Sequence, residues 1–387
     1  MTTRIAILGS TGSIGANTAQ LAAFHGGRFK VVGLSADSDI VSLARQVKKF
    51  RPKIVSVRDK GLALAAKRLI GKGTRVVCGV EGLSEIATMP DVDTVVFATG
   101  GHSCLVPLLY AIDAGKRIAL ANKEALVSAG GLVMRKARQK GVTIVPIDSE
   151  HSAIFQCIEG KRQFVRKLYL TGSGGPLLDV PSSRFDRLSR KSILNHPKWR
   201  MGKKISVDSA TMMNKALEVI EARWLFGMEE SGIEVLIHPE AIVHSMVETL
   251  DGAVFAQMSV PDMRMPILYA LTYPERLKAP VKSVDFTRVK ALTFRKPDMG
   301  KFPCLALASV VLRKGGTHPA VMSAADEEAV KCYLTGRVKF TGIFKLVEKV
   351  LERHKSAGKD PGLKDILAAE AWAREEVRRI VSAGVIR

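Results

Sequence analysis

The first 150 or so residues alternate short apolar runs with amphipathic stretches, and this alternation constrains the fold most strongly. Strand-like runs lie at residues 4–8, 30–34, 53–57, 75–78, 94–98, 117–120 and 142–147. Helical stretches lie between them at residues 17–23, 41–49, 62–70, 105–114 and 124–139. Strands that alternate with helices form parallel sheets covered on both faces. We therefore predict an α/β fold that begins with a Rossmann-like, doubly wound dinucleotide-binding domain over residues 1–149.

A glycine-rich turn, GSTGSIG at residues 9–15, follows the first predicted strand and opens the first helix. Glycines there let backbone N–H groups and the helix N-terminus approach a pyrophosphate. The spacing is GxxGxxG rather than GxGxxG, so a purely structural tight turn is the alternative. The strand before the turn and the helix after it favour a nucleotide-binding loop.

The loop after the second strand contains Asp37, Ser38 and Asp39. Folds of this type bind the adenosine ribose at this loop. An acid there accepts a hydrogen bond from the ribose 2′-hydroxyl, whereas a 2′-phosphate requires Lys or Arg. Taken alone, these residues favour NAD. Asp39 also suits the N-cap of the following helix, which is the structural alternative.

Two acids, Asp148 and Glu150, end the last predicted strand of this domain. Residues i and i+2 of an extended segment point to the same side, so their carboxylates are predicted to converge. Such a pair at the carboxyl end of a strand can form half of a Mg²⁺ or Mn²⁺ site, and a solvated surface pair is the alternative. Glu218 offers the third carboxylate.

One amphipathic helix is predicted from Ser209 to Phe226, ending at Gly227 as its C-cap. Its buried stripe comprises Met213, Leu217, Ile220 and Trp224. On the neighbouring face, Asn214, Lys215 and Glu218 can reach one pocket. Ser209 at the helix start, with Lys215 two turns in, would favour a phosphate dianion.

Two further segments, TGSGGP at residues 171–176 and NHPKWRMG at residues 195–202, bound a predicted active-site lid at about residues 173–203. Glycines permit hinge motion, and a tryptophan can exclude water. Ordinary packing of His196 and Trp199 is the alternative.

After about residue 150 the pattern of strand-like and helical segments changes. We predict a catalytic α+β domain at residues 150–273, a Pro-punctuated linker at 274–303 and a small C-terminal helical bundle at 304–387.

The net charge of +22 suggests an anionic partner, but the basic residues are dispersed and no nucleic-acid reader module is recognisable, so we expect no nucleic-acid partner. No apolar run reaches the roughly 20 residues of a membrane span, and a strand-like RIAIL replaces a signal peptide. We expect a cytoplasmic protein without membrane contacts.

Six stretches carry a family resemblance: GSTGSIG, ANKE, DSEHSAIFQ, TGSGGP, NHPKWRMGKKISVDSATMMNK and PDMRMPI, in this order. Together they resemble the motif set of the 1-deoxy-D-xylulose 5-phosphate reductoisomerase family over essentially the whole chain. The resemblance implies an NADPH-dependent enzyme that requires Mg²⁺ or Mn²⁺ and acts on a small sugar phosphate. It would rearrange and reduce 1-deoxy-D-xylulose 5-phosphate to 2-C-methyl-D-erythritol 4-phosphate in non-mevalonate isoprenoid biosynthesis. The family also implies a homodimer.

The resemblance assigns roles to single residues. Residues that match the metal ligands are Asp148, Glu150 and Glu218. Residues that match the phosphate and lid contacts are Ser173, Ser209, Asn214, Lys215, His196 and Trp199, and those at the reacting end of the substrate are Lys123 and Ser149. Residues that match cofactor contacts are Gly9, Thr11, Gly12, Ser13, Ile14, Asn122, Glu124 and Gly202. The candidate catalytic residues are therefore Lys123, Asp148, Glu150, His196 and Glu218.

One departure from the family concerns the ribose site. The family usually has a small residue, then Lys, Arg or Ser, then Asn, where this chain has Asp37, Ser38 and Asp39. Two acids repel a 2′-phosphate, and Arg45 or Arg58 is a candidate to compensate. The expectation is NADPH rather than NADH, because the departure is local and the resemblance is global.

Two other functions compete with this interpretation. A dehydrogenase of the homoserine or aspartate-semialdehyde type would share the Rossmann and α+β domains but leaves the three carboxylates unexplained. A nucleotide-sensing or basic nucleic-acid-binding protein would suit the charge but leaves the lid without a purpose.

Overall fold

The computed structural model describes residues 2–199 and 201–386, and it consists of two compact units. The first unit comprises Met1–Ala125, Val133–Ser152 and Asp262–Lys282, and the second comprises Leu126–Leu132, Ala153–Pro261 and Ser283–Arg387. No helix among the described residues is both long enough and apolar enough to span a membrane. The finer division of the chain at residues 149, 273 and 303 stays a prediction.

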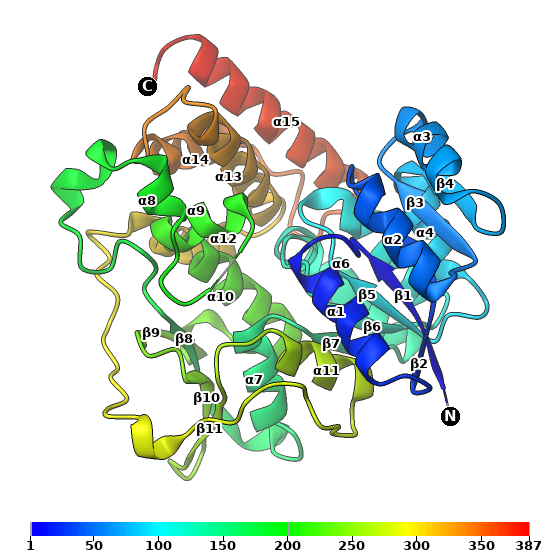
Figure 1. Cartoon of the computed structure of the whole chain (residues 1–387). Coiled ribbons are helices and arrows are strands. Elements are labelled where there is room, and N and C mark those ends of the chain that lie inside the picture. The colour runs from blue at the N-terminus through cyan, green and yellow to red at the C-terminus, as the bar shows by residue number, and fades with distance from the viewer. Residues whose placement is uncertain (1, 200, 387) are drawn as a thin grey trace. The chain divides into compact units, whose positions relative to one another are not determined.

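The first unit is built on a seven-stranded parallel sheet in the order β4-β3-β2-β1-β5-β6-β7 (Figure 1). The strands are β1 Thr3–Leu8, β2 Phe29–Ser35, β3 Ile54–Val57, β4 Arg75–Cys78, β5 Thr94–Phe97, β6 Arg117–Leu120 and β7 Ile144–Pro146. Strands β3 and β5 are buried throughout, as expected for a sheet covered on both faces. The strand order reverses between β1 and β5, where ligands bind in doubly wound sheets. The predicted Rossmann-like fold is confirmed.

Helices cover both faces of this sheet. Right-handed crossovers place the helices that connect β1 to β4 on one face and those that connect β5 to β7 on the other, because the strands are added in opposite directions. The helices are α1 Ser13–Phe24, α2 Ile40–Phe50, α3 Lys60–Ile70, α4 Gly79–Thr88, α5 Leu105–Asp113 and, in part, α6 Glu124–Lys140. Helix α4 was not expected from the sequence. A late helix, α11 Arg264–Thr272, packs against α1, β6 and β7. The backbone carbonyl of Tyr273 accepts a 2.7 Å hydrogen bond from Arg117, which ties this late segment to β6.

The second unit contains a four-stranded mixed sheet in the order β11-β10-β8-β9. Its strands are β8 Val165–Gly172, β9 Ile233–Ile237, β10 Val243–Thr249 and β11 Val254–Met258. β8 pairs parallel with β9, and β10 pairs antiparallel with β8 and β11. Strand β10 was missed in the sequence, since VHSMVET mixes polar and apolar residues without clear alternation. The central α+β architecture is confirmed.

Helices complete the second unit. They are α8 Arg190–Leu194, α9 Lys203–Thr211, α10 Met213–Phe226, α12 Leu307–Lys314, α13 His318–Leu334, α14 Gly342–Arg353 and α15 Leu363–Ser382. α13 contacts α12, α14 and α15 and is buried over most of its length, so it forms the core of the C-terminal bundle (Figure 1). The predicted helical bundle is therefore present.

Candidate functional site

The glycine-rich turn after β1 shows a different reason for each of its three glycines. Gly9 has φ +84°, and a Cβ there would lie 2.6 Å from the carbonyl oxygen of Ala98. A Cβ at Gly15 would lie 2.1 Å from the carbonyl oxygen of Gly9, so this glycine lets α1 pack on the turn. Gly12, the N-cap of α1, has no neighbour closer than 3.5 Å to such a Cβ. The turn therefore leaves the start of α1, with Thr11, Ser13 and Ile14, open to an anion.

The acids of the ribose loop have separate partners. Asp39 is the N-cap of α2 and accepts a 2.9 Å hydrogen bond from the backbone N–H of Ser42, which lowers the pKa of its carboxyl group. Asp37 forms a 3.1 Å ion pair with Arg58, and both side chains are more than half exposed. The N-cap interpretation of Asp39 is confirmed.

Asn122 ties together the carboxyl ends of two adjacent strands, β5 and β6. Its side-chain N–H₂ group donates to the carbonyl oxygens of Thr99, at 2.9 Å, and Gly101, at 2.7 Å. Its amide oxygen accepts from the backbone N–H of Ala125, at 2.9 Å, in the first turn of α6. The side chain thereby fixes the start of α6, which carries Glu124.

Asp148 is held as a carboxylate by its neighbours in the first unit. Its Oδ2 lies 2.9 Å from Nζ of the buried Lys123 and 3.5 Å from Nδ1 of His151. Burial alone would raise the pKa of Asp148, but the Lys123 ammonium and His151 outweigh it and hold that pKa far below its usual range. A carboxylate oxygen of Glu150 lies within 4.8 Å of one of Asp148. The predicted convergence of these two acids is confirmed.

The reason predicted for that convergence is wrong. The segment is not extended, since β7 ends at Pro146 and α7 Ser149–Cys157 begins immediately afterwards. The carbonyl oxygen of Asp148 accepts from the backbone N–H of Ser152 at 2.8 Å. Asp148 thus precedes the first turn of a helix, in which Ser149 donates a hydrogen bond to Glu150. An acid that precedes a helix is a capping signal, and it was missed in the sequence.

Ser209 does not begin a helix, contrary to the prediction. Two helices replace the single predicted one, because Met212 has left-handed backbone geometry, with φ +62°, between α9 and α10. Ser209 lies in the last turn of α9, so the partial positive charge of a helix N-terminus is absent there. A Cβ at Gly175 would lie 2.5 Å from the carbonyl oxygen of Ser209 and 3.1 Å from its Oγ. The glycine-rich loop therefore lies directly on Ser209.

The predicted end of the helix agrees with the structure, and the predicted buried stripe agrees in part. α10 ends at Phe226 with Gly227 as a left-handed C-cap. Met213, Leu217 and Ile220 are fully buried, whereas Trp224 is only partly buried. A Cβ at Gly130 would lie 2.2 Å from the Trp224 ring, so α6 has a glycine where this ring lies.

Lys215 and Glu218 form a buried pair on α10. Nζ of Lys215 donates to the carbonyl oxygen of Thr171 and to Glu218, each at 2.6 Å. The side chain of Asn214 donates to the other carboxylate oxygen of Glu218, which has no solvent exposure. A Cβ at Gly172 would lie 2.8 Å from Cε of Lys215, so this glycine makes room for the lysine. The prediction that these three side chains reach one place is confirmed.

His196 is oriented by the backbone of its own segment. Its Nδ1 accepts from the backbone N–H groups of Lys198, at 3.1 Å, and Trp199, at 2.9 Å. Nε2 therefore carries the proton in the neutral ring and donates to Oγ of Ser173 at 3.0 Å. The Trp199 ring lies 6.2 Å from that of His244, and Gly202 is the N-cap of α9. A hydrogen bond thus joins the two segments that bound the predicted lid, at residues 171–176 and 195–202.

A buried ion cluster behind this segment was not predicted. Nζ of Lys204 lies 2.6 Å from Asp208 and 3.0 Å from Asp326, and both acids are buried. The i, i+4 spacing of the first pair was the only sequence signal, because Asp326 lies on α13 more than a hundred residues later. The cluster joins α9, which carries Ser209, to the core helix of the C-terminal bundle.

Comparisons with known proteins cover nearly the whole chain. Family models match it at residues 5–130 (1-deoxy-D-xylulose 5-phosphate reductoisomerase), 144–226 (the C-terminal domain of that enzyme) and 258–376 (DXP reductoisomerase C-terminal domain). The chain is 48% identical over 381 residues to the reductoisomerase of a Synechococcus species, covering 97% of each protein. It is 49% identical over 390 residues to that of Heliobacterium modesticaldum, covering 99% of each.

Two solved structures are similar in fold. One is a DOX-P reductoisomerase in complex with NADPH, fosmidomycin and magnesium, with a TM-score of 0.94, 39% identity and 98% coverage of both chains. The other is the Zymomonas mobilis reductoisomerase in complex with NADPH, with a TM-score of 0.91, 38% identity and coverage of 98% of this chain and 99% of that one.

Proposed function

The chain belongs to the 1-deoxy-D-xylulose 5-phosphate reductoisomerase family, and from this premise we propose which residues carry out each part of its reaction. The enzyme converts 1-deoxy-D-xylulose 5-phosphate to 2-C-methyl-D-erythritol 4-phosphate in isoprenoid biosynthesis, with NADPH and a divalent metal. The rearrangement of the carbon skeleton precedes the reduction.

The metal ligands we propose are Asp148, Glu150 and Glu218. The observation that carries this proposal is Asp148, which Lys123 and His151 keep ionised although it is largely buried. Glu150 adds a second oxygen within 4.8 Å, and Glu218 is a carboxylate that Asn214 and Lys215 orient. Carboxylate oxygens are the ligands that Mg²⁺ and Mn²⁺ prefer, so the donor set fits. The bound ion supplies Lewis-acid stabilisation of negative charge on the substrate oxygens.

Lys123 and Ser149 would contact the reacting end of the substrate. The Lys123 ammonium is held by Asp148 in a position with 5% exposure, where a hydrogen bond to a developing oxyanion is strong. Ser149 carries a hydroxyl next to Glu150 that can orient a substrate hydroxyl. Both residues would act by positioning and by stabilising charge.

The phosphate of the substrate would bind to Ser173, Ser209, Asn214 and Lys215. The close contact of the glycine-rich loop with Ser209 supports this assignment, since it brings the hydroxyls of Ser173 and Ser209 to one loop. The Lys215 ammonium supplies the positive charge. Ser209 lies at the C-terminal end of α9, where the partial charge of the helix is negative and repels an anion. Hydroxyl and ammonium donors rather than a helix dipole would therefore hold the dianion.

His196 and Trp199 would act from the lid at about residues 173–203. His196 donates to Ser173, so it can pass that hydrogen bond to a phosphate oxygen without changing its tautomer. Trp199 offers a large apolar surface that would exclude water from the reacting substrate. Exclusion of water protects the rearranged aldehyde until it is reduced.

NADPH would bind across the carboxyl ends of β1, β2 and β5. Gly9, Thr11, Gly12, Ser13 and Ile14 would contact the pyrophosphate, and Asn122, Glu124 and Gly202 would complete the cofactor site. The cofactor supplies the hydride. At the ribose, Asp37, Ser38 and Asp39 offer no cation, and we assign the 2′-phosphate to Arg58. An exposed ion pair such as Arg58–Asp37 contributes at most about 1 kcal/mol, so Arg58 can exchange Asp37 for the phosphate.

The assembly and location belong to the proposal as well. The proposed active form is a homodimer, which the exposed edge strand β11 supports. A cytoplasmic location suits the free cysteines among the described residues. The partners would be the sugar phosphate and the second copy, with neither nucleic acid nor membrane.

The metal assignment is tested by Mn²⁺ binding, measured by calorimetry in the absence of substrate. E150Q and E218Q should each raise the Kd of Mn²⁺ about 10- to 100-fold, whereas E159Q, an acid outside the proposed set, should leave it unchanged. Oxidation of NADPH with substrate should fall in parallel. An unchanged Kd in E218Q would remove Glu218 from the ligand set without affecting the family assignment.

A further inference from the structure

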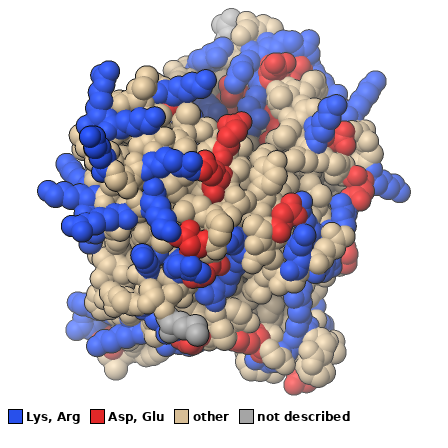
Figure 2. Space-filling model, turned by 90° about the vertical axis from the view of Figure 1, so that its right-hand side faces the viewer, with Lys and Arg blue, Asp and Glu red and all other residues tan. Residues whose placement is uncertain are grey.

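The second unit contains a cavity whose lining includes none of the residues assigned to the metal, the substrate or the cofactor, although part of it belongs to the proposed lid at about residues 173–203. It has a volume of about 700 Å³ and is lined by residues of η3 Ser182–Arg187, the start of α8, the turn after α13 and the end of α15. The high net charge is not gathered into a stripe, since Lys and Arg side chains are spread with Asp and Glu between them over the face in Figure 2. Around this cavity, however, cations predominate.

Three cations and one acid line the cavity. The cations are Arg190, Arg337 and Lys339, and the acid is Asp186. The carboxylate of Asp186 already accepts hydrogen bonds from the backbone N–H and the hydroxyl of Thr341, at 2.9 and 2.7 Å. Within the described part of the chain, neither arginine forms an ion pair, and Arg337 has only a long 3.5 Å contact with Ser382. The lining therefore carries an excess of two positive charges, three cations against one acid.

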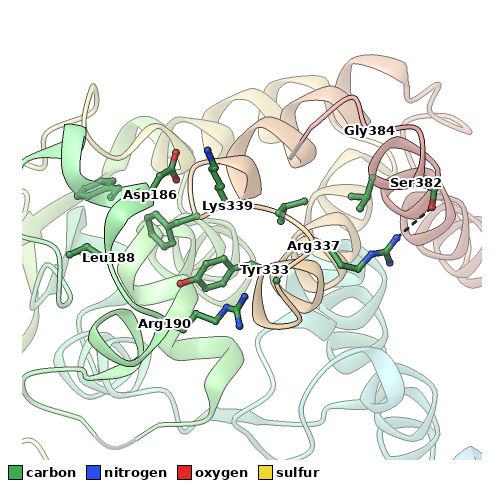
Figure 3. Close-up of a pocket in the computed structure, with 13 residues that line it drawn as sticks. Asp186, Leu188, Arg190, Tyr333, Arg337, Lys339, Ser382 and Gly384 are labelled. Carbon is green, nitrogen blue, oxygen red and sulfur yellow. Dashed lines mark hydrogen bonds between the residues drawn. The ribbon is translucent and has the colours of Figure 1, made fainter.

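Arg190 and the buried Tyr333 lie together on one side of the cavity. Figure 3 shows Tyr333 beside Arg190, and Lys339 beside Asp186. Arg337 extends from the turn after α13 toward Ser382, on the other side of the cavity. Gly336 allows this arrangement, because a Cβ there would lie 2.4 Å from a guanidinium nitrogen of Arg190. Two planar guanidinium groups at one cavity suit a ligand with several oxygen acceptors.

Tyr333 supplies a donor that bonds to none of the described residues. Its side chain is 5% exposed, and its hydroxyl makes no hydrogen bond within the described residues. Burial raises the pKa of this hydroxyl, so it keeps its proton at neutral pH and can donate. A buried hydroxyl without a partner is costly, and an acceptor in the cavity would satisfy it.

The floor of the cavity is apolar. Phe185, Val338 and Phe340 are buried, and the rings of Phe340 and Tyr333 lie edge to face at 5.8 Å. We propose that this cavity is a second anion site, separate from the residues assigned to the substrate, that binds a small organic phosphate. Arg190 and Tyr333 would hold the phosphate, Arg337 would add positive charge from the other side of the cavity, and the aromatic floor would bind the apolar part of the ligand. Inorganic phosphate alone would use only the polar half.

Calorimetric titration of the whole enzyme with phenyl phosphate, at about 0.15 M salt to screen unspecific attraction, tests the proposal. The wild type should show two sites, because the substrate site also accepts a phosphate. R190Q/R337Q should weaken one of them at least about 10-fold, and Y333F, which keeps the ring, should weaken the same site several-fold. Inorganic phosphate should bind this site more weakly than phenyl phosphate.

The matched control is R187Q/K191Q, which removes the same charge from η3 and α8 at positions outside the cavity lining. It should retain both sites, and circular dichroism with a thermal melt should show that every variant is folded. A single site in the wild type, or equal weakening in both double variants, would overturn the proposal. In the second case the net charge rather than the cavity would attract the ligand.

Discussion

At the scale of single residues, Asp39 shows how a side chain can serve the fold and still affect the ligand. Its carboxylate caps α2 through Ser42, which explains an acid at this position without any cofactor. The same negative charge lies in the loop to which we assign the 2′-phosphate of NADPH. The structure confirms the capping role, whereas the effect on the cofactor stays a prediction; only the structure paired Arg58 with Asp37.

Arg58 should therefore determine cofactor preference. R58Q should raise the KM for NADPH about 10-fold and leave the KM for NADH nearly unchanged, because only the former carries the 2′-phosphate. D37N, which removes a repulsive charge, should lower the KM for NADPH. Steady-state kinetics with both cofactors provide the measurement. Equal changes for NADPH and NADH in R58Q would show that Arg58 does not contact the phosphate.

At the scale of elements, the break between α9 and α10 places the proposed phosphate ligands. The apolar periodicity of residues 209–226 continues across the break, so the sequence predicted one helix. Met212 adopts a left-handed conformation that costs about 1 kcal/mol for a residue with a side chain, and tertiary contacts of both helices stabilise it. No local signal marks such a position.

The ion cluster that joins α9 to α13 should be essential for stability. K204M removes a cation that contacts two buried carboxylates, those of Asp208 and Asp326, and it should lower the free energy of unfolding by about 3 kcal/mol. K203M, a change at the exposed neighbouring lysine, should alter it by less than about 0.5 kcal/mol. Urea unfolding compares the two variants, and equal stabilities would mean that the cluster contributes nothing.

The C-terminal helices should lose stability in mild acid through His354. Burial, together with the neighbouring His318, lowers the pKa of His354 from 6.5 to about 4. The unfolded chain then binds more protons than the folded one between these values, so the free energy of unfolding falls as the pH drops from about 6.5 to about 4. With the partial exposure of the ring, the loss should be about 1 kcal/mol.

This loss is measured as the difference between urea unfolding at pH 7 and at pH 4.5 in the wild type and in His354→Phe. Phenylalanine retains a ring against Trp372 but cannot be protonated, so the pH dependence should be smaller in the variant. If both proteins lose stability equally, the acid sensitivity comes from other groups.

At the scale of the whole molecule, strand β11 presents the clearest surface for a second copy. It is an edge strand of the four-stranded sheet, and Val254 and Phe255 are 51% and 40% exposed. Unpaired edges with apolar side chains associate with other chains unless they are covered. A partner sheet at this edge would cover both residues.

Replacing one of these residues should separate the proposed dimer. F255E introduces a charge that an apolar interface cannot solvate, so it should convert the dimer to a monomer at micromolar concentration. L64E, at a residue that is 62% exposed on α3, is the matched control and should remain dimeric. Size-exclusion chromatography with light scattering gives the mass; a dimeric F255E protein would place the interface elsewhere.

The sequence by itself determined the fold class, the order of the elements and the chemical type of each candidate residue. These follow from local pattern: the apolar periodicity, the GSTGSIG turn after β1 and the acids after β7 depend on neighbours a few residues away. The resemblance then supplied the reaction, which the family comparisons confirmed.

Only the tertiary structure decided which side chains meet. Lys123 with Asp148, Lys215 with Thr171, and Lys204 with Asp326 are pairs between separate elements. Their partners are chosen by how strands and helices pack, which local periodicity does not encode. The helical geometry of Ser149 and the helix end at Ser209 were mispredicted for the same reason, since strand ends and helix breaks depend on contacts with distant residues.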